Sequence, residues 1–122
     1  MVVDQPEQIL EEEEIDLLFH ALSDRTRRDI MGKVSVGEQS VSGLARQYDV
    51  SFAAIQKHVA VLEKASLVTK RTEGRRKLVR NNPDTLRRAT ELLARYERVW
   101  TRRIDAIGQI LNEETREEGK HR

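Results

Sequence analysis

The chain has 122 residues, of which 38% are hydrophobic and 35% charged, so it is long enough for one domain with a modest core and too apolar to be disordered. It contains no cysteine, which excludes disulfide bonds, thiolate metal sites, cysteine nucleophiles and thiol redox sensing. The net charge of +1 divides into −8 over residues 1–24, +8 over 25–82 and +1 over 83–122, and a basic middle segment is typical of a polyanion-binding surface, although an ordinary solvated surface has the same composition.

The N-terminal sequence, MVVDQPEQILEEEE, is acidic where a secretory signal would be basic and then apolar. No run of about eighteen apolar residues, the length of a membrane-spanning helix, occurs in the sequence. We therefore expect a cytoplasmic protein without a membrane partner, in which residues 1–8 form a flexible acidic N-terminus.

The first predicted helix spans residues 9–22. Ile15, Leu18 and Leu22 share one face, and Glu11–Glu14 occupy the first turn, where carboxylates favour the positive end of the helix dipole. A cation site at these glutamates is the less favoured interpretation.

A second helix is predicted to follow the start signal Ser23-Asp24 and to end near Gly37. Its apolar face consists of Ile30, Met31 and Val34.

Residues 40–65 have the pattern of a helix-turn-helix. Ser40 is placed to cap a short third helix whose apolar spacing continues to Tyr48, and Ser51 is placed to cap a fourth helix after a break at 49–50. Any bundle contains helix pairs joined by tight turns, so this pattern alone is only moderately specific.

The fourth helix has an unusual outer face. Its predicted buried residues are Phe52, Ile55, Val59 and Leu62. The opposite face has small residues around Gln56 and Lys57, which indicates that something large approaches closely. His58 lies at the edge of the buried face.

A β-hairpin with a cationic tip is predicted next, from strands at 67–72 and 77–81 around the turn residues 73–75. After a helix-turn-helix, such a hairpin is interpreted as a phosphate-contacting wing over 67–81 rather than as a solubility feature.

The last predicted helix starts at Asn82-Pro83 and runs to residue 112. From 84 to 111 it would be about 42 Å long, too long for the chain's short helices to cover. We therefore expect homodimerisation through it, with help from the first helix, and a flexible charged tail at 113–122. The expected interface residues are Ile15, Leu18, Leu93, Tyr96, Trp100, Ile104, Ile107 and Leu111.

Two segments resemble the ArsR/SmtB family of winged-helix transcriptional regulators: LFHALSDRTRRDI at 18–30 and VSGLARQYDVSFAAIQKHVAVLEKASLVTKRTEGRRKLVRNN at 41–82. The resemblance covers about residues 15–111. It implies a mainly α fold with a small β-hairpin (α+β), a single winged helix-turn-helix domain at 9–112, and a DNA-binding homodimer, in which repression is the usual mode of action. Arg25 stands where the family often has proline, which costs little at a first helical position.

The family's usual metal positions are not matched. The third helix lacks the cysteine-bearing metal box, and residues 84–111 contain no histidine. The sequence therefore supports neither metal sensing at those positions nor any cofactor, and it identifies no small-molecule effector, operator or target gene.

A dimer would place helix 51–65 of each copy in successive major grooves of an inverted repeat, with residues 71–77 on the DNA backbone. Gln56 can pair with adenine and Lys57 can reach guanine or a phosphate, while alanines permit close approach. The expected DNA-binding residues are Ser51, Ala53, Ala54, Gln56, Lys57, Ala60, Arg71, Arg75, Arg76 and Lys77.

Two other classes of function compete with this hypothesis. A winged-helix protein-interaction module without DNA specificity would also use the long last helix. An enzyme is suggested only by His58, and it is disfavoured because no local motif supplies a nucleophile, a base and an orienting partner.

Overall fold

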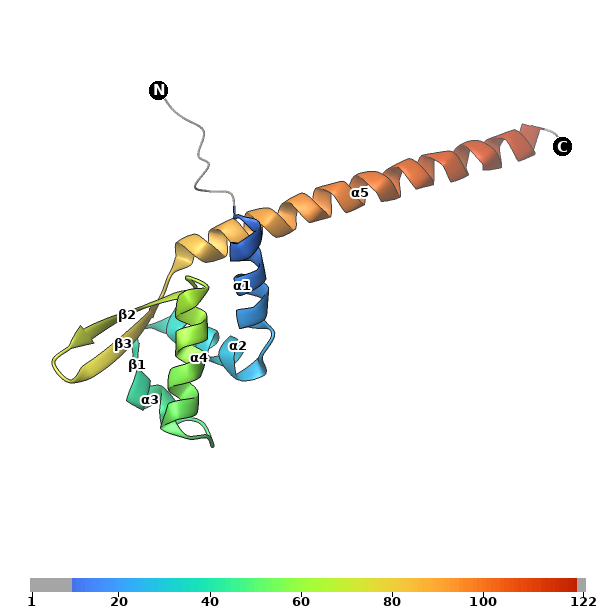
Figure 1. Ribbon diagram of the computed structural model, residues 1–122. Coiled ribbons are helices and arrows are strands. Elements are labelled where there is room, and N and C mark those ends of the chain that lie inside the picture. Colours follow the sequence, from blue (N-terminus) through green and yellow to red (C-terminus); the bar gives the residue numbers. More distant parts are fainter. Residues whose placement is uncertain (1–9, 121–122) are drawn as a thin grey trace, which may run out of the picture. The chain divides into compact units, whose positions relative to one another are not determined.

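The computed structural model describes residues 10–120, which fall into two compact units that divide between Arg88 and Ala89. This division falls inside the single domain that we expected over residues 9–112, and that domain remains a prediction. In chain order the elements are α1 (Glu12–Leu22), α2 (Arg25–Val36), β1 (Gln39–Ser40), α3 (Val41–Ala45), α4 (Phe52–Lys64), β2 (Val68–Glu73), β3 (Arg76–Asn81) and α5 (Pro83–Lys120). Figure 1 labels them along the chain.

Side-chain caps fix the starts of three helices. Asp24 Oδ1 accepts from the Arg27 backbone N–H at 3.0 Å, Ser40 Oγ from Gly43 at 3.0 Å, and Ser51 Oγ from Ala54 at 3.1 Å. The three predicted start signals are confirmed. A Cβ at position 43 would lie 2.8 Å from Ser40 Oγ, so the α3 cap requires glycine there.

The start of α1 and the end of α3 differ from the prediction. α1 begins at Glu12, not at residue 9, because Glu11 and Glu14 form a reciprocal capping box, with the Glu11 N–H donating to Glu14 Oε1 at 3.0 Å. Residue 9 lies outside the described residues. α3 ends at Ala45, and Tyr48 instead donates its hydroxyl hydrogen to Asp29 on α2.

The core of the first unit is formed by side chains from the helices and the sheet. Its fully buried residues include Ile30, Leu44, Ile55, Leu62, Leu67 and Val79. Phe52 was predicted to join them but is 48% exposed, because it is the first residue of α4 and lies at the edge of that helix's buried face. The remaining predicted buried residues of α4 are confirmed.

The sheet has three strands in the order β1-β3-β2, whereas the sequence predicted a two-stranded hairpin. β1 pairs antiparallel with β3 through Gln39 opposite Val79. β2 and β3 pair antiparallel from Val68 opposite Asn81 to Glu73 opposite Arg76, and Gly74 takes a φ of 63° in the turn. The strands therefore occupy 68–73 and 76–81. In Figure 1 the hairpin projects away from α3 and α4.

Arg27 is a buried charged residue that joins two helices. Its Nε donates to the Ala21 carbonyl at 2.8 Å and its Nη2 to the His20 carbonyl at 3.0 Å, both at the end of α1. These carbonyls form the negative end of the helix dipole, where a cation is stabilising.

We expect Arg27→Met to lower the free energy of unfolding by about 2–3 kcal/mol, because it removes two charged hydrogen bonds and the donor to the buried Ala21 carbonyl, whereas the His20 carbonyl keeps its hydrogen bonds from Ser23. Chemical denaturation measures this change. Arg25→Met, at an exposed position of the same helix, is the matched control and should change stability by less than about 0.5 kcal/mol. Equal losses in the two variants would contradict this role for Arg27.

α5 starts at Pro83, as predicted, and continues to Lys120, beyond residue 112 where we expected it to end. The segment 113–120, predicted to be a flexible tail, is thus helical. Its charged sequence lacks apolar periodicity but contains no helix-breaking residue before Gly119.

Candidate nucleic-acid interface

One side of α4 is exposed and has short side chains. Ile55, Val59 and Leu62 are buried on the opposite side. Of the predicted groove-facing residues, Ala54 is partly exposed, and the exposed ones are Ser51, Ala53, Gln56, Lys57 and Ala60. The fold therefore brings the predicted α4 residues together on one surface, and their contact with DNA remains a prediction.

Two exposed apolar residues, Val50 and Phe52, lie at the start of this surface and are not among the predicted DNA-binding residues. In a helix-turn-helix the N-terminal residues of the second helix lie closest to the base edges. An aromatic ring there can contact a thymine methyl group. The helical spacing of Phe52 from Ile55 suggested burial, and only its position at the helix end could have indicated otherwise.

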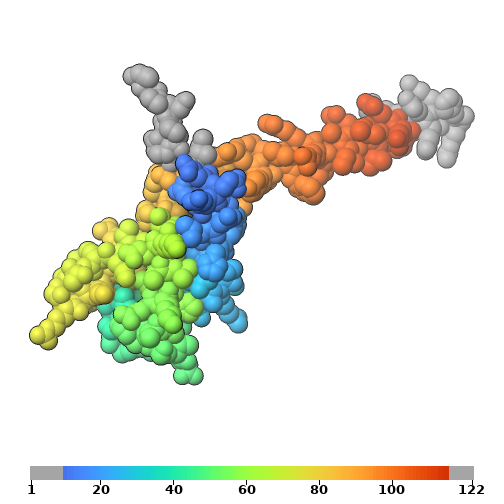
Figure 2. All heavy atoms as spheres, viewed as in Figure 1, coloured from blue at the N-terminus to red at the C-terminus, as the bar shows by residue number. Residues whose placement is uncertain are grey.

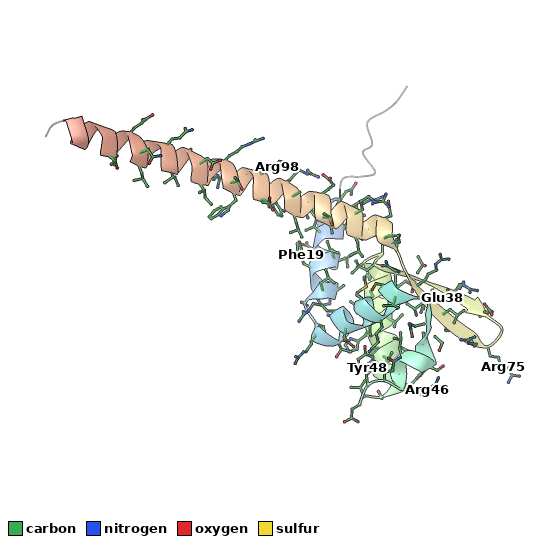
Figure 3. All side chains as sticks on the ribbon, turned by 180° about the vertical axis from the view of Figure 1, so that it is seen from behind. Phe19, Glu38, Arg46, Tyr48, Arg75 and Arg98 are labelled. Atoms are coloured by element: carbon green, nitrogen blue, oxygen red, sulfur yellow. The ribbon has the colours of Figure 1, made fainter. Side chains whose placement is uncertain are left out.

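The wing has its exposed cations at the tip. Arg75 follows Gly74 in the turn, and Arg76 and Lys77 begin β3. All three are exposed. Figure 2 shows the hairpin as an arm that protrudes from the first unit, and Figure 3 places Arg75 at its far end. An exposed cationic tip of this kind can reach a phosphate backbone.

Arg71 differs from the other predicted phosphate contacts because it is already paired. Its Nε and Nη2 donate to the two carboxylate oxygens of Glu38 at 3.0 and 2.9 Å, and its Nη1 donates to Glu73 Oε2 at 2.8 Å. Hydrogen bonds from Arg71 lower the pKa of Glu38 below its usual value, and the two carboxylates raise the pKa of Arg71. A phosphate contact by Arg71 remains a prediction, for a guanidinium that is already paired with two carboxylates.

His58 packs against the start of α2 rather than facing the groove side. Its Nδ1 lies 3.3 Å from Arg27 Nη1 and 4.0 Å from Asp24 Oδ1. The Arg27 backbone N–H, with lesser contributions from His58 and the Arg27 charge, keeps the pKa of Asp24 below its usual value. Among the side chains that the structure describes, no group of three or more His, Asp or Glu residues is arranged to hold a metal ion. The predicted packed role of His58 fits these contacts.

The second unit has a row of exposed apolar side chains along α5, at least 47% exposed in each case. It includes the predicted residues Leu93, Tyr96, Trp100, Ile104, Ile107 and Leu111, and in addition Val99 and Ile110, which the sequence analysis did not select. Such a row on one helix indicates an uncovered contact surface.

The predicted contribution of α1 needs a correction. Leu18 is 2% exposed in the core and is not accessible to a second copy of the chain. Ile15 is partly exposed, and Phe19 is the exposed large apolar residue of α1. Position 18 was selected from its helical spacing, which identifies an apolar face but not what covers it.

No helix within residues 10–120 combines the length and apolar character that a membrane crossing requires.

Comparison with known proteins places the chain in a family. Residues 24–70 match the family model described as bacterial regulatory protein, arsR family. HTH-type transcriptional regulator Rv2034 of Mycobacterium tuberculosis is 34% identical over 99 residues, which cover 81% of this chain and 90% of that protein. The solved structure of an ArsR-like transcriptional regulator from Rhodococcus sp. RHA1 is 36% identical, covers 83% of this chain and 93% of its own, and has a TM-score of 0.76.

A more distant structure supports the fold alone. The homodimeric winged helix-turn-helix DNA-binding domain of Mb0332 from Mycobacterium bovis is 22% identical, with a TM-score of 0.58 and coverage of 70% of this chain and 82% of that one. The match to the family model, the similarity to Rv2034 and that to the Rhodococcus structure, together with the winged arrangement of α3, α4 and the β2–β3 hairpin, show that the chain belongs to the ArsR family of winged helix-turn-helix transcriptional regulators, DNA-binding proteins rather than enzymes.

Proposed function

We propose that this regulator is a cytoplasmic homodimer that represses transcription by binding an inverted-repeat operator. α4 of each protomer enters a major groove, the wing contacts the adjacent backbone, and α5 pairs the two protomers. A dimer bound across a promoter would exclude RNA polymerase, which is the simplest route from DNA binding to repression.

The outer face of α4 carries this proposal. The major groove is about 12 Å wide and admits an α-helix only when side chains facing the bases are compatible with close approach. Ala53 and Ala60 supply short side chains on either side of Gln56, an amide able to pair with adenine. The single acidic residue of α4, Glu63, is in its last turn and forms an ion pair with Lys70 at 3.6 Å, so its charge is partly offset.

The exposed apolar face of α5 supports the homodimer. It runs from Leu93 to Leu111, with Trp100 the most exposed of its large apolar side chains. Burial of such a face against a second copy removes apolar area from water, and Trp and Tyr are typical interface anchors. Two-fold symmetry in the protein would then match two-fold symmetry in the operator.

Selection from a random duplex pool with the purified protein tests the proposed function. We expect enrichment of a palindromic site whose half-sites lie about one helical turn apart. Failure to enrich any palindrome, together with no duplex binding at low salt, would favour the protein-interaction module instead.

The wing is expected to supply affinity rather than sequence preference. Arg75→Gln with Arg76→Gln should weaken binding to operator and random duplexes alike and reduce the slope of log K against log salt by about one unit for each phosphate that the wing no longer neutralises. Titrations at several salt concentrations measure both effects.

The matched control removes the same charge from α5, by Arg98→Gln with Arg102→Gln. Both residues are exposed on the side of α5 away from Trp100. The control should leave the salt slope unchanged. If both pairs reduced it equally, general electrostatic attraction would account for the wing's effect.

A further inference from the structure

A polar cluster lies where the wing meets the rest of the first unit. We name the cluster of Glu38, Arg71 and Glu73 the wing clasp. Glu38 lies between α2 and β1, whereas Arg71 and Glu73 belong to β2. Figure 3 shows Glu38 near the base of the hairpin and Arg75 at its tip.

The geometry of the clasp is that of a two-pronged ion pair. Arg71 uses Nε and Nη2 for the two oxygens of Glu38, at 3.0 and 2.9 Å, and keeps Nη1 for Glu73 at 2.8 Å. A guanidinium bound in this way is fixed in orientation as well as in distance. The side chain of Arg71 therefore restricts the angle between β2 and the segment that carries Glu38.

The clasp lies at the edge of a mostly polar depression. This open depression has a volume of about 400 Å³, and its lining is polar except for one side chain: Val34, Glu38, Arg71, Arg80 and Asn81. The ion pair thus links β2 directly to the α2–β1 segment, in addition to the backbone pairing of β1 with β3.

Lys70, which precedes Arg71 in β2, forms an ion pair on the opposite face of the strand. Lys70 Nζ lies 3.6 Å from Glu63 Oε1 on α4. Since successive side chains of a strand point to opposite faces, Lys70 and Arg71 tie β2 to two different parts of the unit. One tie reaches the helix proposed to read the bases, and the other reaches the segment before β1.

We propose that Arg71 is a positioning residue, which with Glu38 and Glu73 sets the angle at which the cationic tip of the wing meets the DNA backbone. This inference rests on the proposed function. Arg71, Glu38 and Glu73 are at least 30% exposed, so their ion pairs add little to the stability of the fold. Instead, these ion pairs set the orientation of the wing.

The two possible roles of Arg71 predict opposite effects of Glu38→Gln on the affinity for DNA. If Arg71 contacts phosphate, removal of the Glu38 carboxylate frees the guanidinium and removes a negative charge, and both changes tighten DNA binding. If Arg71 positions the wing, the same substitution loosens it. We expect operator binding weaker by about twofold to fivefold, the range given by a surface ion pair of up to about 1 kcal/mol.

Asp49→Asn is the matched control, because Asp49 is an exposed acid in the turn before α4 and outside the clasp. It should leave operator affinity unchanged or increase it. The melting temperature of each variant should stay within a few degrees of wild type, which separates a displaced wing from a damaged fold.

The double variant Glu38→Arg with Arg71→Glu completes the test. It keeps the net charge and restores the ion pair in reverse, so it should recover operator affinity to within about twofold, whereas Arg71→Glu alone should not. Tighter binding by Glu38→Gln, or no recovery in the double variant, would overturn the positioning role. Absence of duplex binding by the wild-type protein would instead overturn the proposed function.

Discussion

A Trp100→Glu variant should be monomeric at micromolar concentration and should bind the operator at least about 100-fold more weakly than the wild-type protein. The affinity falls because two linked half-site contacts become independent, and linkage of two binding modules contributes about 10² to 10⁴ in avidity. Sedimentation measures the first effect and an operator titration the second.

The physical reason lies in the exposed face of α5. Trp100 is 63% exposed in the protomer, near the middle of the row from Leu93 to Leu111. A carboxylate at the centre of an apolar interface would have to be buried without a partner, and this costs several kcal/mol.

Gln109→Glu is the matched control, since Gln109 is exposed on the opposite side of α5 and the substitution introduces the same charge. It should leave both the dimer and operator affinity close to wild type. If Trp100→Glu remained dimeric at low concentration, the proposed interface on α5 would have to be abandoned.

Features set by local chemistry could be predicted from the sequence. Asp24, Ser40 and Ser51 start helices because a short oxygen-bearing side chain can satisfy a free N–H within three residues. Pro83 begins α5 because a first helical residue needs no N–H donor. In each case the signal and its structural effect lie within one turn of helix.

Features set by tertiary contacts could not be predicted. β1 is a two-residue strand that exists because β3 lies beside it, and Gln39-Ser40 has no strand pattern of its own. Leu18 and Phe52 each sit on an apolar helical face, yet one is buried and the other exposed. Periodicity identifies a face, whereas its coverage depends on elements distant in sequence.

In the candidate site, the partners of the charged side chains likewise could not be predicted from the sequence. Arg71 and Arg75 are both wing arginines close in sequence, and composition gave them the same role. The structure pairs Arg71 with Glu38, more than thirty residues away in the chain, and leaves Arg75 exposed at the tip. Only the fold shows that Arg71 is paired with a distant carboxylate whereas Arg75 lies at the tip of the wing.

Gln56→Ala with Lys57→Ala should reduce the preference for the operator over random duplex by about tenfold to 100-fold, since each good contact to a base edge is worth about 1–3 kcal/mol of discrimination. Binding to random duplex should fall much less, because only one cationic side chain is removed. Competition titrations with a selected operator and a scrambled duplex at one salt concentration measure the ratio.

Lys64→Ala is the matched control for the charge. Lys64 is exposed in the last turn of the same helix, whereas Gln56 and Lys57 lie in its N-terminal half, where recognition helices approach the bases. The control should weaken both duplexes slightly and leave their ratio unchanged. Equal losses on operator and random duplex in the Gln56 and Lys57 variant would remove the assignment of α4 as the reading helix. Loss of operator preference alone would establish that the short outer face of α4 reads bases.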